Sequence, residues 1–553
     1  MPSLLTYWNT LRHLKPIQLY GRIRLRLVKP RINLTTAPLL RTQSGRAWVN
    51  PTRRRASMIG PESFCFLNET HNLTEGWDNP TQEKLWRYNL HYFDDLNALD
   101  AVKRVEWQQA LLLRWVRENT PTVGTGWNPF PTSLRIVNWI KWALVGNVLP
   151  PECIQSLAVQ SRWLLRRLET HLMGNHLFAN AKALVFTGLF FEGTEANNWL
   201  EKGLRILERE IPEQILSDGG QFERSTMYHA LATEDMLDLY NMTTAYESAL
   251  SSRWRSININ WWKRIIPMRV WLKTMCHPDG EISFFNDATS GISPAPIEIE
   301  QYAARLELPN CPFSLQGITH LADSGYIRVE QDNAVAILDV APIGPDYLPG
   351  HAHADTLSFE LSLFKQRVFV NSGISCYGNS IERLRQRGTT AHNTVVVNEK
   401  NSSEVWSSFR VARRAQPQKL EIKRNGRIIV RCAHNGYQHL PGNPDHSREW
   451  LFGENALVVE DRITGKFGHA EARFHLHPSV KIDKKIIPSS DNTKVLLQLP
   501  GGHKLQISVE GGVLRNQIST WHSEFGLSEP NICIAVFFNN SMIRTHLKWA
   551  SAL

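Results

Sequence analysis

Histidine and asparagine side chains interrupt an apolar segment, GNHLFANAKAL, near residue 175. His176 and Asn180 are four residues apart, so on a helix they lie on one face, and Asn175 at the helix start can lean toward the same place. An imidazole flanked by amides could bind a polar ligand or transfer a proton. The alternative is an asparagine N-cap followed by a histidine whose hydrogen bonds stay within the fold.

A second group of titratable side chains lies in the segment GGQFERSTMYHALATED, where two glycines indicate a turn before a helix. The group comprises Glu223, Arg224, Tyr228 and His229. These residue types suit acid–base catalysis and anion binding. A helix start stabilised by a salt bridge in its first turn is the alternative.

Two histidines and an aspartate alternate in the segment GHAHAD, directly before an alternating apolar strand. In an extended chain His351, His353 and Asp355 project to one side. Imidazoles two residues apart can converge on a metal ion or serve as acid–base groups. A chance pair of surface histidines is the alternative.

A basic loop, RLRQRGTTAHNTVVVN, leads into another strand. Its arginines Arg383, Arg385 and Arg387 alternate, and His392 and Asn393 follow where the strand begins. Because a guanidinium group binds carboxylates with two hydrogen bonds, this loop could contact an acidic ligand. A solvated basic loop is the alternative.

Helical periodicity dominates the chain before about residue 315. Apolar residues recur at the spacing of amphipathic helices in a series of segments: 107–119, 133–147, 153–172, 175–191, 196–210, 227–246 and 259–276. Consecutive helices with short connectors predict antiparallel hairpins curled into an incomplete α/α toroid. We assign residues 81–315 to this domain and residues 1–80 to an N-terminal lead-in region.

The apolar period changes to two after residue 320. The segment 356–364, TLSFELSLF, places its leucines and phenylalanine on one face. Similar alternation occurs at 393–398, 427–432, 455–460, 471–477, 494–498 and 504–509. Many short strands without intervening helices predict an antiparallel β-sandwich over residues 316–553. The fold class is therefore α+β multidomain, with an N-terminal toroid and a C-terminal sandwich.

Composition indicates an affinity for polyanions. The 553 residues carry a formal net charge of +10, which favours nucleic acid, anionic membranes or acidic glycans as partners. One basic cluster, formed by Arg22, Arg24, Arg26 and Lys29, could instead be an amphipathic segment in peripheral contact with a membrane.

Seven scattered cysteines without a CxxC pair argue against a disulfide framework and a zinc ribbon. The N-terminal residues lack the apolar core of a signal peptide, and no stretch is long and apolar enough for a transmembrane segment. A cytoplasmic protein is the expectation.

Six segments together resemble the heparinase II/III family of polysaccharide lyases. They are WRYNLHYFDDL, NPFPTSLRIVNW, GNHLFANAKAL, DGGQFERSTMYH, HAHADTLSFEL and RGTTAHNTVVVN, in order between about residues 80 and 400. The resemblance implies a toroid joined to a β-sandwich. It also implies β-elimination on a uronic-acid-containing polysaccharide, either a glycosaminoglycan or a bacterial exopolysaccharide. The expected partner is thus an acidic polysaccharide and not nucleic acid.

The resemblance also implies roles for single residues. Tyr228 matches the catalytic tyrosine, Asn175 and His176 match the motif that faces the substrate carboxylate, and His351 matches a second catalytic histidine. Tyr377 follows at a spacing that suits an active-site tyrosine. We expect His229 to complete the catalytic group, and we expect five residues to bind substrate: Asn180, Glu223, Arg224, Arg387 and Asn393. A phenol has a pKa of about 10, so base duty for Tyr228 requires cationic neighbours, for which Arg224, His229 and the basic loop are candidates.

The sequence departs from the family pattern at two positions, one in the expected metal site and one near the substrate carboxylate. The resemblance implies that His353, Asn371 and His392 hold a divalent ion, with Zn²⁺ expected. Relatives often carry aspartate at the position of Asn371, and an amide is the poorer Zn²⁺ ligand. Many relatives carry glutamate where this chain has Ala179, so neutralising the substrate carboxylate would fall on other residues.

Two other functions remain open from the sequence. A glycoside hydrolase would need opposed carboxylates, for which Asp218, Glu223 and Asp287 are candidates. A non-catalytic polysaccharide-binding or assembly factor is the third interpretation, favoured if the changes at Ala179 and Asn371 have disabled the site.

Overall fold

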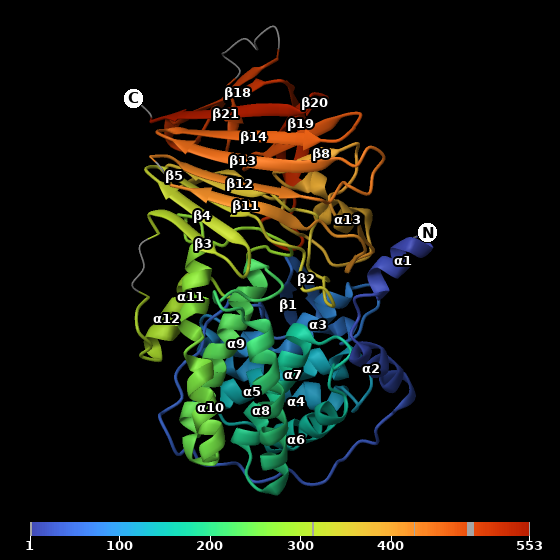
Figure 1. The fold of residues 1–553 in the computed structure, drawn as a ribbon. Coiled ribbons are helices and arrows are strands. Elements are labelled where there is room, and N and C mark those ends of the chain that lie inside the picture. Colours follow the sequence, from blue (N-terminus) through green and yellow to red (C-terminus); the bar gives the residue numbers. More distant parts are fainter. Residues whose placement is uncertain (1–2, 312–314, 425, 484–491, 552–553) are drawn as a thin grey trace.

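The chain folds into a helical half and a β half that stack on one another, as the computed structural model shows (Figure 1). The structure describes residues 3–311, 315–424, 426–483 and 492–551. Helix α12 ends at Arg305 and strand β3 begins at Gly317, so the change of hydropathy period coincides with the change of architecture. Residues 312–314, directly before the boundary predicted at residue 315, lie outside the described residues.

Antiparallel helices build the helical half as an α/α toroid, which confirms the predicted fold class. Helix α7 lies at its centre: nearly all of its residues are buried, and it packs against α5, α8 and α9. The helices of this half are α3 (Lys84–Tyr92), α4 (Val105–Glu118), α5 (Pro129–Leu144), α6 (Pro151–Arg166), α7 (Gly174–Phe190), α8 (Thr194–Gln214), α9 (Thr226–Ala245), α10 (Ser252–Trp262), α11 (Ile265–Thr274) and α12 (Pro296–Arg305).

Two predicted helices differ from the structure. The segment 259–276 is divided between α10 and α11. Pro267 explains the break, because a proline is tolerated in the first turn of a helix but not in its interior. The segment predicted to run to residue 172 ends at Arg166, and the following turn, in which the amides of Leu172 and Met173 bond to the carbonyl of Glu169, leads into α7.

Three antiparallel sheets form the β half. A five-stranded sheet has the order β3-β4-β5-β6-β7, a four-stranded sheet the order β19-β20-β15-β8, and an eight-stranded sheet the order β11-β12-β13-β14-β21-β18-β17-β16. A bridge between Phe369 and Leu476 connects the first two sheets. Side chains of all three sheets share one core, in which Phe359 contacts Trp450 and Phe474 at ring-centroid distances of 6.3 and 6.2 Å. The predicted antiparallel sandwich is confirmed.

The principal strands of the five-stranded sheet are β3 (Gly317–Leu321), β4 (Tyr326–Gln331), β5 (Ala334–Asp339), β6 (Phe359–Leu363) and β7 (Gln366–Phe369). Those of the four-stranded sheet are β8 (Val395–Val397), β15 (Ala470–His475), β19 (Val513–Trp521) and β20 (Glu529–Phe538). Those of the eight-stranded sheet are β11 (Pro417–Lys423), β12 (Ile428–His434), β13 (Asp445–Gly453), β14 (Ala456–Thr464), β16 (Lys481–Ile482), β17 (Lys494–Gln498), β18 (Lys504–Glu510) and β21 (Met542–Ala550). A short helix, α13 (Ile381–Arg387), and the small pair β9 (Val405–Trp406) and β10 (Arg410–Val411) lie beside the sheets.

The polar face of β6 meets the helical half and not solvent. Glu360 and Ser362 are both buried, and each bonds to one ring nitrogen of His277, at 2.6 and 2.8 Å. Beside them, Trp271 of α11 donates to the Ser324 hydroxyl at 2.8 Å, and that hydroxyl donates to Asp218 at 2.8 Å. These contacts fix how the two halves sit on each other.

The lead-in region runs along the helical half, and its residues Met58 and Phe64 are buried in the core of that half. It contains α1 (Leu4–Leu11), α2 (Pro16–Leu27), β1 (Ser63–Phe66) and β2 (Glu69–Asn72). Figure 1 shows α1 extending from the side of the molecule next to the junction of the two halves. Within the described residues, no helix combines the length and apolar character needed to cross a bilayer.

Candidate active site

A cavity of about 1000 Å³ lies between the two halves. Side chains of α3, α5, α7 and α9 line it from the helical side, and residues around positions 350, 377, 409 and 525 line it from the β side. Six of the predicted catalytic and substrate-binding residues border this cavity: Asn175, His176, Glu223, Tyr228, His351 and Tyr377. Segments far apart in the chain therefore meet at one place, of a size that suits a ligand site.

Tyr228 and His351 are in direct contact across the cavity. Their ring centroids lie 4.0 Å apart, and the Tyr228 hydroxyl is 2.9 Å from that of Tyr377. Ser225 caps α9 by accepting from the Tyr228 amide at 3.2 Å, and its hydroxyl donates to the carbonyl of Asp287 at 2.6 Å. The start of α9, which carries Tyr228, is thus anchored to Asp287.

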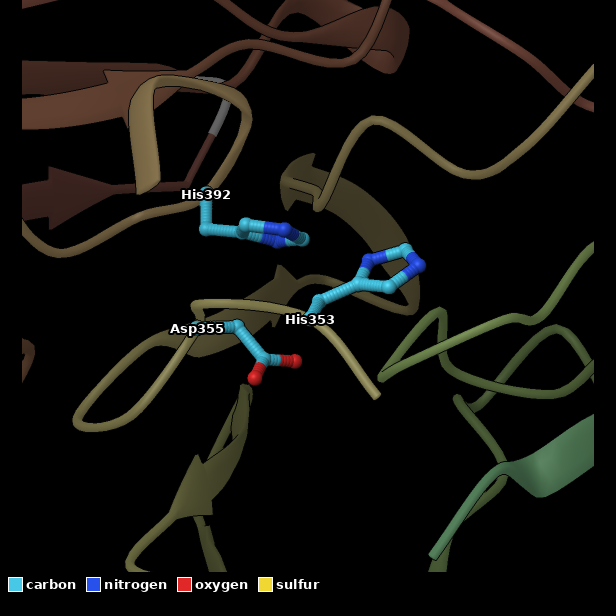
Figure 2. Close-up of side chains that lie close together, drawn as sticks. All are labelled: His353, Asp355 and His392. Carbon is cyan, nitrogen blue, oxygen red and sulfur yellow. The ribbon is translucent and has the colours of Figure 1, made fainter. Parts of the chain in front are cut away.

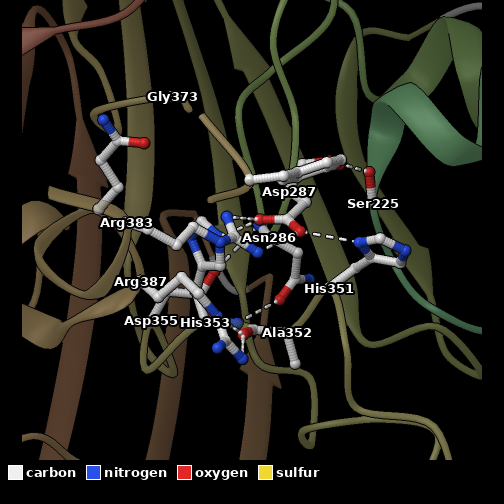
Figure 3. Close-up of polar contacts among 12 residues, drawn as sticks. Ser225, Asn286, Asp287, His351, Ala352, His353, Asp355, Gly373, Arg383 and Arg387 are labelled. Carbon is white, nitrogen blue, oxygen red and sulfur yellow. Dashed lines mark hydrogen bonds and ion pairs between the residues drawn. The ribbon is translucent and has the colours of Figure 1, made fainter. Parts of the chain in front are cut away.

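Asp287 is a fully buried carboxylate that organises the β side of the site (Figure 3). It accepts two hydrogen bonds from Arg383, at 2.5 and 2.6 Å, and one each from His351 Nδ1 and His353 Nε2, both at 2.8 Å. Burial alone would raise its pKa, but the Arg383 guanidinium and the two histidines hold the pKa of Asp287 well below its usual range. Because Nδ1 of His351 donates to this anion, Nε2 is left for the cavity.

His176 is oriented by a carboxylate that the sequence reasoning missed. Its Nδ1 lies 3.2 Å from Glu169 Oε1, and its ring contacts Phe130 at a centroid distance of 4.5 Å. Burial lowers the pKa of His176, but Glu169 more than offsets this and raises it overall. The only available signal was an acidic residue shortly before the GNH motif, in a segment predicted to be helical.

Glu223 presents a buried carboxyl group to the cavity. Its side chain is 1% exposed, and burial raises its pKa. One oxygen accepts from Gln221 at 3.2 Å. The other, Oε2, makes no hydrogen bond within the described chain and lies 3.8 Å from His351 Nε2. A neutral carboxyl with an unused oxygen can donate a hydrogen bond to an anionic ligand.

Two residues of the α9 segment do not face the cavity, which corrects their predicted roles. His229 is buried on the other side of α9, where its nitrogens contact the Gln221 amide at 3.2 Å and the Met268 carbonyl at 2.8 Å, and burial lowers its pKa to about 4. Arg224 donates to the Ser324 carbonyl at 2.9 Å. Neither residue supports the predicted lowering of the Tyr228 pKa, which burial raises well above its ordinary value.

Three further predicted substrate-binding residues belong to the framework of the site. Arg387 donates to the carbonyl of Ala352 at 3.0 Å, and Asn393 donates to that of Phe359 at 2.8 Å, both from fully buried positions. Asn180 donates to Glu169 Oε2 at 3.0 Å and accepts from its amide at 2.8 Å. Polar residues in these motifs satisfy buried backbone or orient other side chains, and direct substrate contact is not their role in this geometry.

A group of donor atoms suited to a metal ion lies next to Asp287, to which His353 bonds (Figure 2). His353, Asp355 and His392 each offer one ligand atom, and these atoms lie within 4.8 Å of one another. His353 Nδ1 and His392 Nε2 are buried and make no hydrogen bond to any residue that the structure describes. Burial raises the pKa of Asp355 to about 6, so its anion would gain from a cationic partner.

Asn371, a predicted metal ligand, lies beside His392. Its Oδ1 lies 3.1 Å from His392 Nδ1, on the ring nitrogen opposite the unpaired one. Asn371 is therefore placed to orient His392, and Asp355 supplies the carboxylate among the converging groups.

An α/α toroid joined to an antiparallel β-sandwich, with a tyrosine and a histidine in contact between them, places the chain in the structural class of heparinase III. The solved heparinase III has a TM-score of 0.68 at 19% identity, covering 84% of this chain and 77% of that one. A mutant heparan sulfate lyase from Pedobacter heparinus has a TM-score of 0.61 at 16% identity, covering 97% and 88%. At these identities the likeness concerns the fold alone.

The chain belongs to the heparinase II/III family. The family description "Heparinase II/III N-terminus" matches residues 83–304, and "Heparinase II/III-like, C-terminal" matches residues 315–546. The heparin-sulfate lyase of Bacteroides stercoris is 26% identical over 323 residues, which are 53% of this chain and 44% of the relative. That of Pedobacter heparinus is 24% identical over 366 residues, 62% and 51% respectively. The chain thus spans about half the length of these curated relatives.

Replacing Arg383 by methionine tests the buried ion pair around Asp287. We expect Arg383→Met to lower the free energy of unfolding by about 3–5 kcal/mol, because it leaves the buried carboxylate without its cation. Guanidinium unfolding followed by tryptophan fluorescence measures the change. The control is Arg205→Met, whose exposed pair with Glu201 should contribute less than about 1 kcal/mol. Equal effects of the two substitutions would contradict the organising role of Asp287.

Proposed function

We propose that the protein is a polysaccharide lyase that cleaves a uronic-acid-containing polysaccharide by β-elimination. The observation that carries this proposal is the contact of Tyr228 with His351 at the cavity, with Asp287 behind the histidine and Tyr377 beside the tyrosine. Membership of the heparinase II/III family supports it. The curated relatives are heparin-sulfate lyases, which supports a glycosaminoglycan or a similar acidic glycan as substrate.

The reaction needs a base for the proton on carbon 5 of the uronate. His351 suits this role, because Nε2 is free toward the cavity while Nδ1 donates to Asp287. As the proton transfers to Nε2, its former bonding electrons form the double bond between carbons 4 and 5, and the bond from carbon 4 to the glycosidic oxygen breaks. The Asp287 anion stabilises the imidazolium that results.

The leaving oxygen needs a proton, and Tyr228 suits this role. Burial raises the pKa of Tyr228, so the phenol holds its proton until a strongly basic oxygen develops beside it. The proton that His351 has taken from carbon 5 can afterwards pass to the Tyr228 phenolate, because the two rings are in contact, and Tyr377 keeps its hydrogen bond to the same oxygen. The site thus separates the base and the acid, whereas the sequence-based expectation gave Tyr228 a lowered pKa.

Neutralisation of the substrate carboxylate is assigned to Glu223 with Asn175 and His176. Ala179 lines the cavity, so the carboxyl group that many relatives carry at its position is missing from this wall. Glu223 supplies a carboxyl group from the other side, and its raised pKa favours the protonated form. Donation of that proton in a hydrogen bond disperses the charge of the substrate and makes the carbon 5 proton more acidic.

A divalent ion is proposed at His353, Asp355 and His392. Two buried imidazole nitrogens without hydrogen bonds and a nearby carboxylate fit the preferences of Zn²⁺. Such an ion would fix the segment that carries His351, since His353 also bonds to Asp287. The chemistry of the lyase step remains with the side chains at the cavity.

The glycoside hydrolase alternative loses two of its three carboxylates. Asp218 accepts from the amide and the hydroxyl of Ser324, and Asp287 is held as an anion by Arg383. Neither residue lines the cavity. Glu223 alone does not provide the pair that hydrolysis requires.

The function is tested by incubating the protein with heparan sulfate, chondroitin, hyaluronan and alginate and recording ultraviolet absorbance. We expect absorbance from the unsaturated uronate with at least one polymer. Tyr228→Phe keeps the ring packing and should lower turnover by about 10²- to 10⁴-fold, because the proton donor is lost. New reducing ends without absorbance would indicate hydrolysis, and binding without either signal would indicate a non-catalytic glycan-binding factor.

The role of Glu223 is tested by a pair of substitutions. Glu223→Gln keeps a neutral hydrogen-bond donor and should retain activity within about tenfold, whereas Glu223→Ala should lose about 10²-fold or more. In the unsubstituted protein, activity should fall as pH rises through the raised pKa of Glu223, and this fall should be absent from the glutamine variant. Profiles of kcat/KM against pH measure both. Equal losses in the two variants would assign Glu223 a purely structural role.

The metal site is tested by elemental analysis and thermal unfolding. We expect His353→Ala to abolish Zn²⁺ binding and lower the unfolding midpoint, and Asn371→Asp to tighten binding by about 10- to 100-fold, because an acidic partner makes His392 a stronger ligand. The exposed His469→Ala is the control and should change neither. Stoichiometric metal in His353→Ala would show that the ligands are different ones.

A further inference from the structure

The lead-in region has an extreme charge pattern. No aspartate or glutamate precedes Glu62 in the chain, whereas arginine and lysine recur throughout those residues. The basic side chains of α1, α2 and the following loop include Arg12, Arg24, Arg26, Lys29 and Arg31, all of which are exposed. None of these five forms an ion pair in the described parts of the chain, whereas Lys15 pairs with Glu213.

Helix α1 buries polar side chains and exposes apolar ones. Its buried residues are the polar Asn9 and Thr10, and Thr10 accepts a hydrogen bond from Trp406 at 3.1 Å. Leu4 and Trp8 point outward, with 90% and 64% of their surfaces exposed. Exposure of such large apolar side chains on one short helix marks an interaction surface.

Helix α2 likewise exposes large apolar side chains. It buries Gln18, which donates to the Tyr347 carbonyl at 3.2 Å, and Gly21, which packs against the backbone of His171 so closely that a larger residue would clash. Ile23 and Leu27 are 59% and 77% exposed. The apolar side chains on both helices thus lie outside, interspersed with the unpaired cations.

We propose that α1 and α2 form a docking surface for an anionic phospholipid membrane. We call it the N-terminal face and define it by its exposed residues: Leu4, Trp8, Leu11, Arg12, Tyr20, Ile23, Arg24, Arg26, Leu27 and Lys29. Apolar and aromatic side chains enter the boundary between headgroups and acyl chains, while arginine and lysine bind lipid phosphates. A soluble polyanion would use the cations but not the leucines, and a second copy of the face would bring like charges together.

Docking through this face would hold the cavity close to the bilayer. Gln18 bonds to Tyr347, and Leu348 and Gly350 of the same loop line the cavity. On α1, Tyr7 contacts Trp406 at a ring-centroid distance of 5.3 Å, and Phe409 in that segment also lines the cavity. The surface is therefore built onto the two loops that border the proposed site.

Co-sedimentation of the full chain with vesicles tests the proposal. We expect binding to phosphatidylcholine vesicles that contain phosphatidylglycerol, weak binding to phosphatidylcholine alone, and release by high salt. Each basic residue at an anionic surface strengthens binding about fivefold, so Arg24→Gln with Arg26→Gln should weaken it about 25-fold. Trp8→Ser with Ile23→Ser should weaken it at least about tenfold.

The matched control combines Arg515→Gln with Ile518→Ser on β19, which carries an exposed arginine and an isoleucine that is 93% exposed. It should bind vesicles as the unsubstituted protein does, and all variants should keep the same thermal unfolding midpoint. Absence of sedimentation with the anionic vesicles would overturn the proposal. So would equal binding to neutral vesicles, or light scattering that shows self-association lost in the Trp8 and Ile23 variant.

Discussion

A single buried anion, the carboxylate of Asp287, sets the arrangement of the β side of the site. Such a charge is costly to bury unless cations and hydrogen bonds surround it, and Arg383, His351 and His353 supply them. The arginine takes both oxygens, and each histidine takes one. The direction in which His351 presents its second nitrogen to the cavity is therefore a consequence of where this anion can be satisfied.

The contact between the two halves fixes the position of His351 relative to the helices. His277 bonds to two side chains of β6, and Trp271 bonds to the turn before β4, so the five-stranded sheet cannot shift independently of the helices. Tyr228 is coupled to the β half through Asp287: the cap of its helix bonds to the backbone of Asp287, and the carboxylate of Asp287 binds His351. The proposed acid and base, which come from different halves, can then stay within contact distance, as catalysis by preorganised groups requires.

Sequence patterns predicted the fold and the cavity-facing motifs better than the roles within them. Periods of 3.6 and 2 identify toroid and sandwich because they reflect burial along a single element. Arg387 and Asn393 looked like substrate contacts, but they bond to backbone carbonyls that only the folded chain brings near. The raised pKa of Tyr228 could not be predicted either, because it results from burial, which depends on how the folded chain packs around the phenol. Asp287 was noted only as a hydrolytic carboxylate, since its three partners lie at least 64 positions away in the chain.

Asp287 and the residues that bond to it lie far apart in the chain, and this separation affects when their contacts can form during synthesis. Asp287 is synthesised with the helical half, whereas Arg383 and both histidines follow in the β half. A toroid emerging from the ribosome therefore carries a carboxylate that water must solvate until about a hundred further residues have been made, at a rate of about 5–20 residues per second. The hydrogen bonds that hold His351 toward the cavity therefore form only after both halves have been synthesised.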